Sequence, residues 1–212
     1  MQDSELLFNT ISALAIGLVV SLAPGAARAA SDDSRGLYVG AGVGQSDVDT
    51  SCGVAGGAIS NCDTTNTAWK AYLGYQFNKW IALEGGYTQF GDVNASGSVG
   101  LVPFTAKTET WGIPVYAVGS IPFSLDSNGN YKLSVLGKLG AVRWDQDRSS
   151  SLPGNSGSDT GWDFAYGAGV QLTLSEHLGI RGEWEKFNKV GNASTGGESD
   201  IQMWTVGLNY KF

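Results

Sequence analysis

The sequence has very few of the residues that most enzyme and metal sites use. Among its 212 residues there is a single histidine, His177. Acyl-transfer chemistry, including that of a lipid-modifying enzyme, needs a nucleophile, a histidine base and a carboxylate that orients it. His177 stands beside Glu176 in a short polar link, and nothing in the strand pattern described below completes such a triad around it. We therefore expect no enzymatic activity, no catalytic residue and no cofactor.

Basic residues are also scarce, with 13 Lys and Arg against 20 Asp and Glu and a formal net charge of -7. Binding nucleic acid requires a basic stripe that neutralises phosphates, so a nucleic-acid partner is excluded. The carboxylates are scattered and form no calcium-loop pattern, so no metal site is expected. Glu183 and Glu185 alternate with other residues on one face of a predicted strand. Basic residues opposite them explain this pair better than acid–base catalysis does.

No apolar run reaches the roughly 20 residues that a membrane-spanning helix needs. A shorter apolar stretch lies around 11–22 and is followed by the small residues Ala-Arg-Ala at 27–29, which is a typical cleavage pattern. We interpret residues 1–29 as an export signal and 30–212 as the mature domain. The absence of Lys and Arg from the first ten residues departs from the usual signal. An uncleaved membrane anchor is the alternative.

The two cysteines, Cys52 and Cys62, lie close together in the polar segment "TSCGVAGGAISNCDTT". In an exported chain, such a pair is most simply a disulfide that closes a loop. The chain-entropy model gives such a small loop about 2–3 kcal/mol of stabilisation. A metal or redox pair is the alternative, but it needs a closer spacing and histidine ligands.

Glycine is abundant, at 31 residues, and from Gly36 onward the chain alternates with period two, the pattern of β-strands. The eight alternating segments cover residues 36–46, 67–77, 80–91, 108–121, 131–144, 161–174, 178–188 and 201–212. Short links at 78–79, 122–130 and 175–177 take turns with long polar links at 47–66, 92–107, 145–160 and 189–200. Such alternation is typical of outer-membrane barrels, which have short periplasmic turns and long outer loops.

The faces of these segments decide which solvent they meet. In the second and third segments Leu73, Tyr75 and Leu83 share one face, while Glu84 takes the other. The interior of an eight-stranded barrel has room only for side chains, so the bulky apolar face looks outward. In water that face would exceed the apolar patches that soluble monomers tolerate. We therefore predict an all-β fold, an eight-stranded antiparallel up-and-down transmembrane β-barrel. A soluble, lipocalin-like carrier with reversed faces is the alternative.

Large aromatic residues are predicted near the strand ends, where membrane interfaces favour them. These residues are Trp80, Trp111, Trp162, Trp184, Trp204 and Tyr210. Inside the barrel we expect a network of charged side chains that plugs the lumen, because a buried unpaired charge is costly. Its members are Glu84, Lys138, Arg181, Glu183 and Lys211, with Tyr38 and Gln171 near them. A small or gated, porin-like channel is the alternative.

Several motifs together resemble the OmpA-like family, that is, the eight-stranded transmembrane domain of outer membrane protein A and its relatives. They are "GLYVGAGVG", "LGYQFNKWIALEGGYTQFGD", "GKLGAVRW", "GVQLTLSEHLGIRGEWEKF" and the final "VGLNYKF". In this resemblance Glu84 and Arg181 match the family's lumen charges. Val118 stands near a position that is basic in the family. Because the sequence ends at Phe212, the peptidoglycan-binding domain of longer members is not expected.

The resemblance also implies a cellular context. It implies a monomer that crosses the outer membrane of a Gram-negative bacterium several times, among outer-membrane lipids and lipopolysaccharide. The C-terminal strand ending at Phe212 resembles the family's signal to the barrel-assembly machinery. The implied role is structural or interactive: membrane integrity, and loops that meet host surfaces or phage.

Overall fold

The computed structural model describes residues 35–49, 58–63, 65–99, 102–125, 132–151, 157–191 and 198–212. The predicted signal at 1–29 lies outside these residues, and so does Cys52 of the predicted disulfide. The strands are β1 (Gly36–Asp49), β2 (Ala58–Asp63), β3 (Thr65–Gln76), β4 (Ile81–Val99), β5 (Val102–Ser124), β6 (Lys132–Ser150), β7 (Gly157–Thr173), β8 (Leu178–Val190) and β9 (Ser199–Lys211). Among the described residues there is no helix that is long and apolar enough to cross a membrane.

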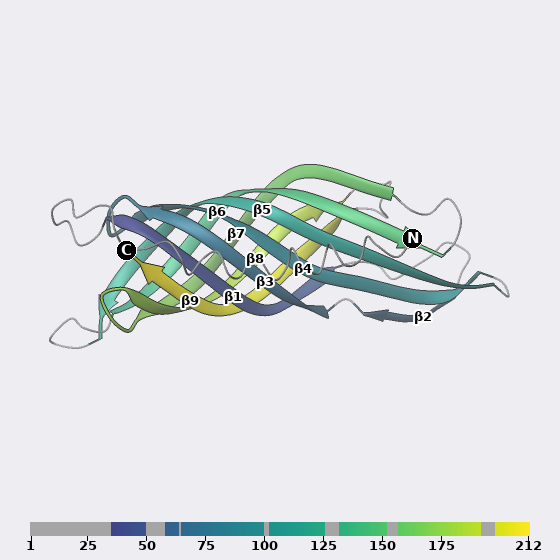
Figure 1. Cartoon of the computed structure of the whole chain (residues 1–212), viewed down its shortest axis with the longest axis horizontal. Helices are drawn as coiled ribbons and strands as arrows, with labels where there is room; N and C mark the ends of the chain where they lie inside the picture. Colours follow the sequence, from purple (N-terminus) through teal and green to yellow (C-terminus); the bar gives the residue numbers. More distant parts are fainter. Residues whose placement is uncertain are drawn as a thin grey trace, which may run out of the picture. The chain divides into compact units, whose positions relative to one another are not determined.

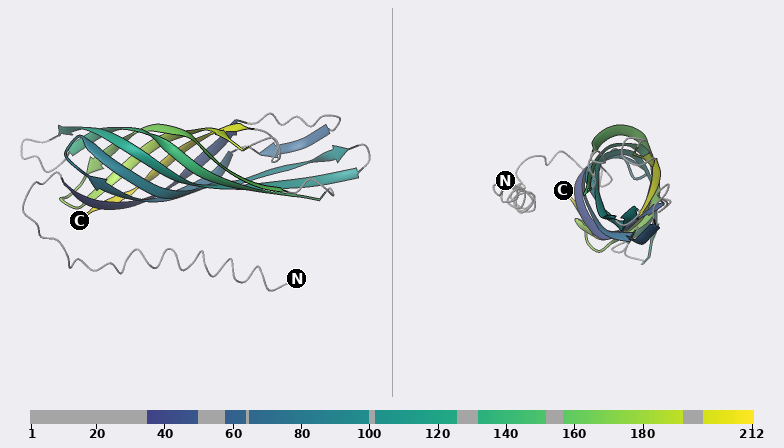
Figure 2. Two further views of the ribbon diagram at one scale, coloured as in Figure 1. Left: turned by 90° about the horizontal axis from the view of Figure 1, so that it is seen from above. Right: turned by 90° about the vertical axis from the view of Figure 1, so that its right-hand side faces the viewer.

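Eight of these strands close into an antiparallel barrel (Figures 1 and 2). The order around the wall is β4-β3-β1-β9-β8-β7-β6-β5, and β5 returns to pair with β4. The first and last strands join in continuous register from Tyr38↔Lys211 to Asp49↔Asp200. The short strand β2 pairs with β4 beyond the end of β3. The predicted all-β, eight-stranded fold is confirmed.

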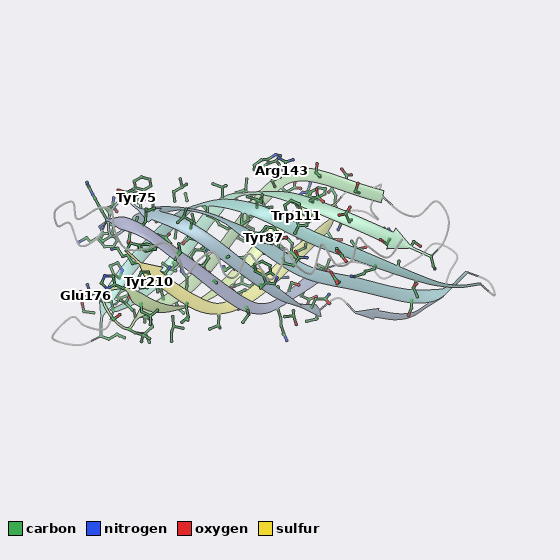
Figure 3. The ribbon with its side chains drawn as sticks, viewed as in Figure 1. Tyr75, Tyr87, Trp111, Arg143, Glu176 and Tyr210 are labelled. Carbon is green, nitrogen blue, oxygen red and sulfur yellow. The ribbon has the colours of Figure 1, made fainter. Side chains whose placement is uncertain are left out.

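The two faces of the wall point as the alternation predicts. Leu73 and Leu83 are 54% and 48% exposed on the outside, whereas Glu84 is 1% exposed and points inward. Figure 3 shows apolar side chains standing outward around the barrel. Further examples from other strands are Val43, Val115, Leu139, Phe164, Val170, Trp204, Val206 and Leu208. This polarity contradicts the soluble-carrier alternative, which needs these side chains inside.

The predicted long loops at 92–107 and 145–160 are largely strand, which corrects the boundaries inferred from the sequence. β4 and β5 continue through most of 92–107, and β6 and β7 continue into 145–160. The segment 47–66 contains β2 and the ends of its neighbours. Figure 1 shows these strands reaching far beyond the end of β9 on one side of the barrel. We call this end the long-strand end and the opposite one the short-turn end. Alternation does not mark these extensions, because outside lipid both faces of a sheet tolerate polar residues.

Aromatic side chains stack across neighbouring strands on the outer face. The Tyr87 ring lies 5.4 Å from Trp69 and 5.7 Å from Trp111, and the rings of Trp184 and Trp204 lie 6.3 Å apart. Trp111, Trp184 and Trp204 lie well inside β5, β8 and β9, not near the strand ends as predicted, so this aromatic belt crosses strands that extend past it. Such belts form at the membrane–water interface. The belt therefore marks where the lipid ends along strands that continue beyond it.

Candidate functional site: the charged lumen

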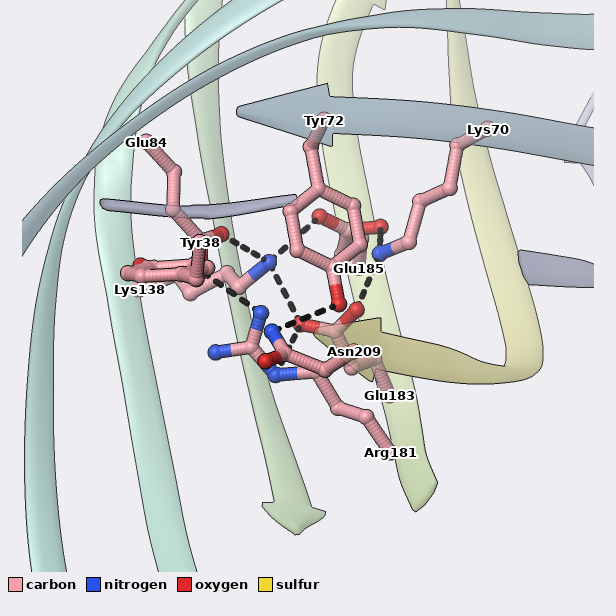
Figure 4. A network of polar contacts seen from close by, with 9 residues as sticks. All are labelled: Tyr38, Lys70, Tyr72, Glu84, Lys138, Arg181, Glu183, Glu185 and Asn209. Atoms are coloured by element: carbon pink, nitrogen blue, oxygen red, sulfur yellow. Dashed lines mark hydrogen bonds and ion pairs between the residues drawn. The ribbon is translucent and has the colours of Figure 1, made fainter. Parts of the chain in front are cut away.

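Six charged side chains from four strands meet inside the barrel (Figure 4). They are Lys70 on β3, Glu84 on β4, Lys138 on β6 and Arg181, Glu183 and Glu185 on β8. The three residues of β8 are two positions apart, so the strand pleat sends all three into the lumen. Each of the six residues is at most 5% exposed.

Glu84 holds two of the cations and one phenol. Arg181 Nη1 donates to Glu84 Oε1 at 2.6 Å, and Lys138 Nζ lies 2.7 Å from Oε2. The Tyr38 hydroxyl donates to Oε1 at 2.8 Å. The Tyr38 ring reaches this carboxylate across Gly74, where a Cβ atom would lie only 2.2 Å from the ring. A glycine at this position is therefore needed for the contact.

The other two carboxylates share the same cations. Lys70 Nζ lies 2.5 Å from Glu183 Oε2 and 2.5 Å from Glu185 Oε2. Lys138 forms an ion pair with Glu183 and lies 3.5 Å from Glu185 Oε1, and Arg181 Nε lies 3.7 Å from Glu183 Oε1. The network thus joins β3, β4, β6 and β8 across the lumen.

The network is balanced, with three carboxylates against three cations. Ions this deeply buried are tolerated only when each one has partners. The Tyr72 ring adds a further contact surface, since it lies 5.1 Å from the Arg181 guanidinium carbon and 5.4 Å from Lys138 Nζ. The network thereby cross-links four strands of the barrel wall.

The sequence and the structure agree in part on the membership of this network. Glu84, Lys138, Arg181 and Glu183 all take part. Lys211 is not among the six: it is half-buried at the end of β9, opposite Tyr38 in register. Gln171 lies opposite Arg181 in register.

Lys70 is not among the residues predicted from the sequence, and Glu185 is predicted only as one of a carboxylate pair. Lys70 has the same parity as Tyr72 and Gly74, the inward positions of β3, so its place was readable from the alternation. Val118, the apolar departure from the family pattern, is buried.

A layer of apolar side chains fills another part of the interior, and we call it the apolar septum. Its members are Ala68, Phe90, Val142, Ala165, Phe187, Ile201 and Met203, each at most 2% exposed. The expectation that small and ionised residues fill the lumen is therefore incomplete, because this layer is apolar. Phe90 stands an even number of positions from Glu84, and Phe187 an even number from Arg181. The alternation therefore predicts that both rings point inward.

Among the described residues no cluster of three or more His, Cys, Asp or Glu side chains could hold a metal ion. His177 is exposed in the turn between β7 and β8, and its ring stacks on Tyr210 with a centroid distance of 5.7 Å. The main chain of His177 accepts a hydrogen bond from the Lys211 N–H at 2.7 Å. These contacts place His177 as a turn residue that packs against β9.

Comparisons with known proteins agree with this architecture. Residues 14–212 match the family model described as outer membrane protein beta-barrel domain. The chain is 29% identical over 204 residues to outer membrane protein A of Escherichia coli O157:H7, covering 93% of this chain and 54% of that protein. It is 30% identical over 212 residues to outer membrane protein A of Serratia marcescens, covering 93% and 55%. The chain thus spans about half the length of these relatives.

Solved structures show the same fold at lower identity. The attachment invasion locus protein Ail of Yersinia pestis, in complex with the heparin analogue sucrose octasulfate, has a TM-score of 0.53 at 19% identity, covering 84% of this chain and 99% of that one. Neisserial surface protein A has a TM-score of 0.51 at 16% identity, covering 83% and 97%. With its closed eight-stranded wall and outward apolar face, the chain belongs to the outer membrane protein β-barrel family and crosses the Gram-negative outer membrane several times.

Proposed function

We propose that this protein is a non-enzymatic, structural barrel of the outer membrane whose lumen is closed. The observation that carries this proposal is the balanced network of Lys70, Lys138 and Arg181 with three carboxylates, which ties four strands together across the lumen. Beside it lies a cavity of about 10 Å³, which holds no more than about one water molecule. A hydrated ion needs far more room.

Planar-bilayer recording of the purified, refolded protein tests the closed lumen. We expect no reproducible single-channel steps from the wild type. Regular steps of one size would overturn the proposal and favour the small or gated channel instead. Migration on gels with and without heating, run on the same preparation, verifies that the sample is folded.

We propose further that the long-strand end faces the cell exterior and meets other surfaces. In support, the strands extend past the aromatic belt at this end, and exposed residues there, such as Lys107, Ser149 and Thr160, are polar. Shortening the β4–β5 and β6–β7 extensions separately, in cells that display the protein, tests this role. Loss of adhesion to host cells or of phage adsorption in one variant is expected. Unchanged binding in both variants, at equal surface levels, contradicts it.

The C-terminal strand is proposed as the signal for the barrel-assembly machinery. In support, Trp204, Val206, Leu208 and Tyr210 alternate outward and lead to Phe212, which is 51% exposed. We expect Phe212→Ser to lower the amount assembled in cells while purified protein still refolds in detergent. Phe164→Ser, on the outer face of β7, is the matched control. Equal assembly of both variants would refute this signal.

We propose further that the protein is a monomer. Chemical cross-linking in native membranes tests this, and a cross-linked dimer would contradict it.

A further inference from the structure

Two aromatic rings meet in the lumen from opposite walls of the barrel. β4 and β8 are four strands apart in both directions around the closed wall. Phe90 comes from β4 and Phe187 from β8, and yet their ring centroids lie 4.7 Å apart in an edge-to-face arrangement. The contact therefore spans the interior of the barrel. It is the centre of the apolar septum defined above.

The other members of the septum surround this contact from the remaining walls. Val142 comes from β6, Ala165 from β7 and Ala68 from β3, and β9 contributes both Ile201 and Met203. All of them are shielded from solvent to the same degree as a core residue. Beside them, on β1, the Ser46 hydroxyl donates to the Phe90 carbonyl, so its polar group is bonded to the main chain.

The septum and the charge network are stacked along the barrel. Phe187 follows Glu185 by two positions on β8, and Val142 follows Lys138 by four on β6, both towards the long-strand end. On β3, which runs the other way, Ala68 precedes Lys70 by two positions. On every one of these strands the apolar member is thus nearer the long-strand end than the charged one. The lumen has two layers of different chemistry in series.

We propose that the apolar septum is a seal in its own right, which keeps the lumen closed to ions even when the charge network is broken. This inference rests on the proposed closed lumen. Water can substitute for a lost partner in a charged network because it donates and accepts hydrogen bonds, and small ions can pair with the charges left behind. An apolar constriction offers none, and hydrophobic constrictions close pores by excluding water. An ion that passed the network would still have to lose its hydration at the Phe90–Phe187 contact.

A cycle of variants measures the two layers separately. Glu84→Gln breaks the network, and Phe90→Ala with Phe187→Ala opens the septum. In planar bilayers we expect Glu84→Gln alone to be as silent as the wild type. In the double-alanine background the same Glu84→Gln change should raise the frequency of ion-conducting openings by at least about tenfold, which corresponds to about 1.4 kcal/mol of barrier.

Two controls keep the result interpretable. Phe164→Ala makes the same chemical change on the lipid-facing side of β7, where the side chain is exposed, and it should leave Glu84→Gln silent. Heat-modifiable migration verifies the fold of each variant. If the triple variant does not fold, Phe187→Ala with Glu84→Gln is recorded instead, since it keeps one ring.

The inference is overturned if Glu84→Gln conducts with the septum intact. It is also overturned if the folded septum variants carrying Glu84→Gln stay silent. Failure of the underlying proposal looks different, since the wild type itself would then conduct. In that case the ratio of opening frequencies with and without the septum still decides whether the septum is a seal.

Discussion

Glu84 connects β4 with three other strands of the barrel. Its two oxygens bind Arg181, Lys138 and the Tyr38 hydroxyl, which come from β8, β6 and β1. Removing the charge leaves three buried cations with only two carboxylates. Breaking one partner of a buried ion pair costs about 3–5 kcal/mol, because the remaining charge stays desolvated.

We therefore expect Glu84→Gln to lower the free energy of unfolding by about 3–5 kcal/mol. Urea titration in lipid vesicles, followed by tryptophan fluorescence, measures this difference. Glu176→Gln removes a carboxylate from an exposed turn and should change stability by less than about 0.5 kcal/mol. Equal effects of the two changes would show that the network contributes nothing to stability.

Alternation in the sequence predicts most of the inward charged residues, but it does not predict which of them contact one another. Parity tells which face a residue takes, and so it correctly assigned Glu84 and Arg181 to the lumen. It does not tell how far along the barrel axis two inward residues lie from each other, which depends on register between strands. For this reason parity gives Lys211 and Lys70 the same inward face, and only the register shows that Lys70 reaches Glu183 and Glu185.

At the scale of strands, the sequence located the membrane-crossing parts and missed their continuation. Alternation is enforced where one face meets lipid and the other a packed lumen. Beyond the aromatic belt, main-chain pairing continues the sheet, as in Asn94↔Lys107 and Lys107↔Ser149. Gly91 marks an irregularity in the pairing of β4, with φ +83°, where a Cβ atom would lie 2.6 Å from Asn66. The β4 part of this extension is also rich in Gly, Ser and Asn, a composition that is typical of loops. For this reason the sequence predicts a loop where the structure has a strand.

A charge placed on the lipid-facing side of a strand tests the membrane-crossing parts. Leu208 lies on β9 between Trp204 and Phe212, opposite Ala41 and Ile180 in register. We expect Leu208→Arg to destabilise the barrel by about 2–4 kcal/mol, the cost of an arginine near the middle of the bilayer. Urea unfolding in lipid vesicles measures it. Thr160→Arg, at the exposed long-strand end of β7, should be near neutral, and a similar loss there would contradict the assignment of faces.

The β4–β5 extension contains a small ion cluster outside the membrane. Lys107 Nζ lies 2.5 Å from Glu109 Oε1 and 3.0 Å from Asp92 Oδ2. The hydrogen bonds to Glu109 and then Asp92 raise the pKa of Lys107 above its ordinary value. Because the folded pKa is raised, the cluster stabilises the extension fully below the ordinary lysine pKa of about 10.4 and less as pH rises through the raised value.

An NMR titration of the Lys107 ammonium checks this direction. In the wild type we expect the midpoint above that of a free lysine side chain, and in Asp92→Asn with Glu109→Gln we expect a return to the ordinary value. A midpoint that is the same in both proteins would show that the two carboxylates do not hold the lysine in solution.

At the scale of the whole molecule, closure joins the two ends of the described chain. The Phe212 N–H donates to the Leu37 carbonyl at 3.0 Å, and β1 pairs with β9 along its length. Every barrel strand therefore has two neighbours, as a bilayer requires of its backbone groups. These strand pairs do not depend on which strand comes first in the sequence.

A circular permutant tests this independence. Joining Phe212 to Arg35 through a short Gly-Ser linker and opening the chain between β5 and β6 keeps every strand pair. We expect the purified permutant to refold in detergent and to migrate faster unheated than heated, as the wild type should. In cells, with residues 1–29 kept ahead of its new N-terminus, it should accumulate in the outer membrane much less, because its last strand no longer ends in Phe212. A permutant that cannot refold in detergent would mean that chain order, not pairing, determines closure.

The placement of the network's partners bears on the route by which the chain enters the bilayer. Lys70 and Glu84 lie on adjacent strands, but each forms its ion pairs with residues of β6 or β8, much later in the sequence. A β3–β4 hairpin inserted alone would expose a bare ammonium and a bare carboxylate to hydrocarbon, which is expensive. Insertion of this hairpin alone is thereby disfavoured, and we expect it to enter the bilayer together with the strands that carry its ionic partners.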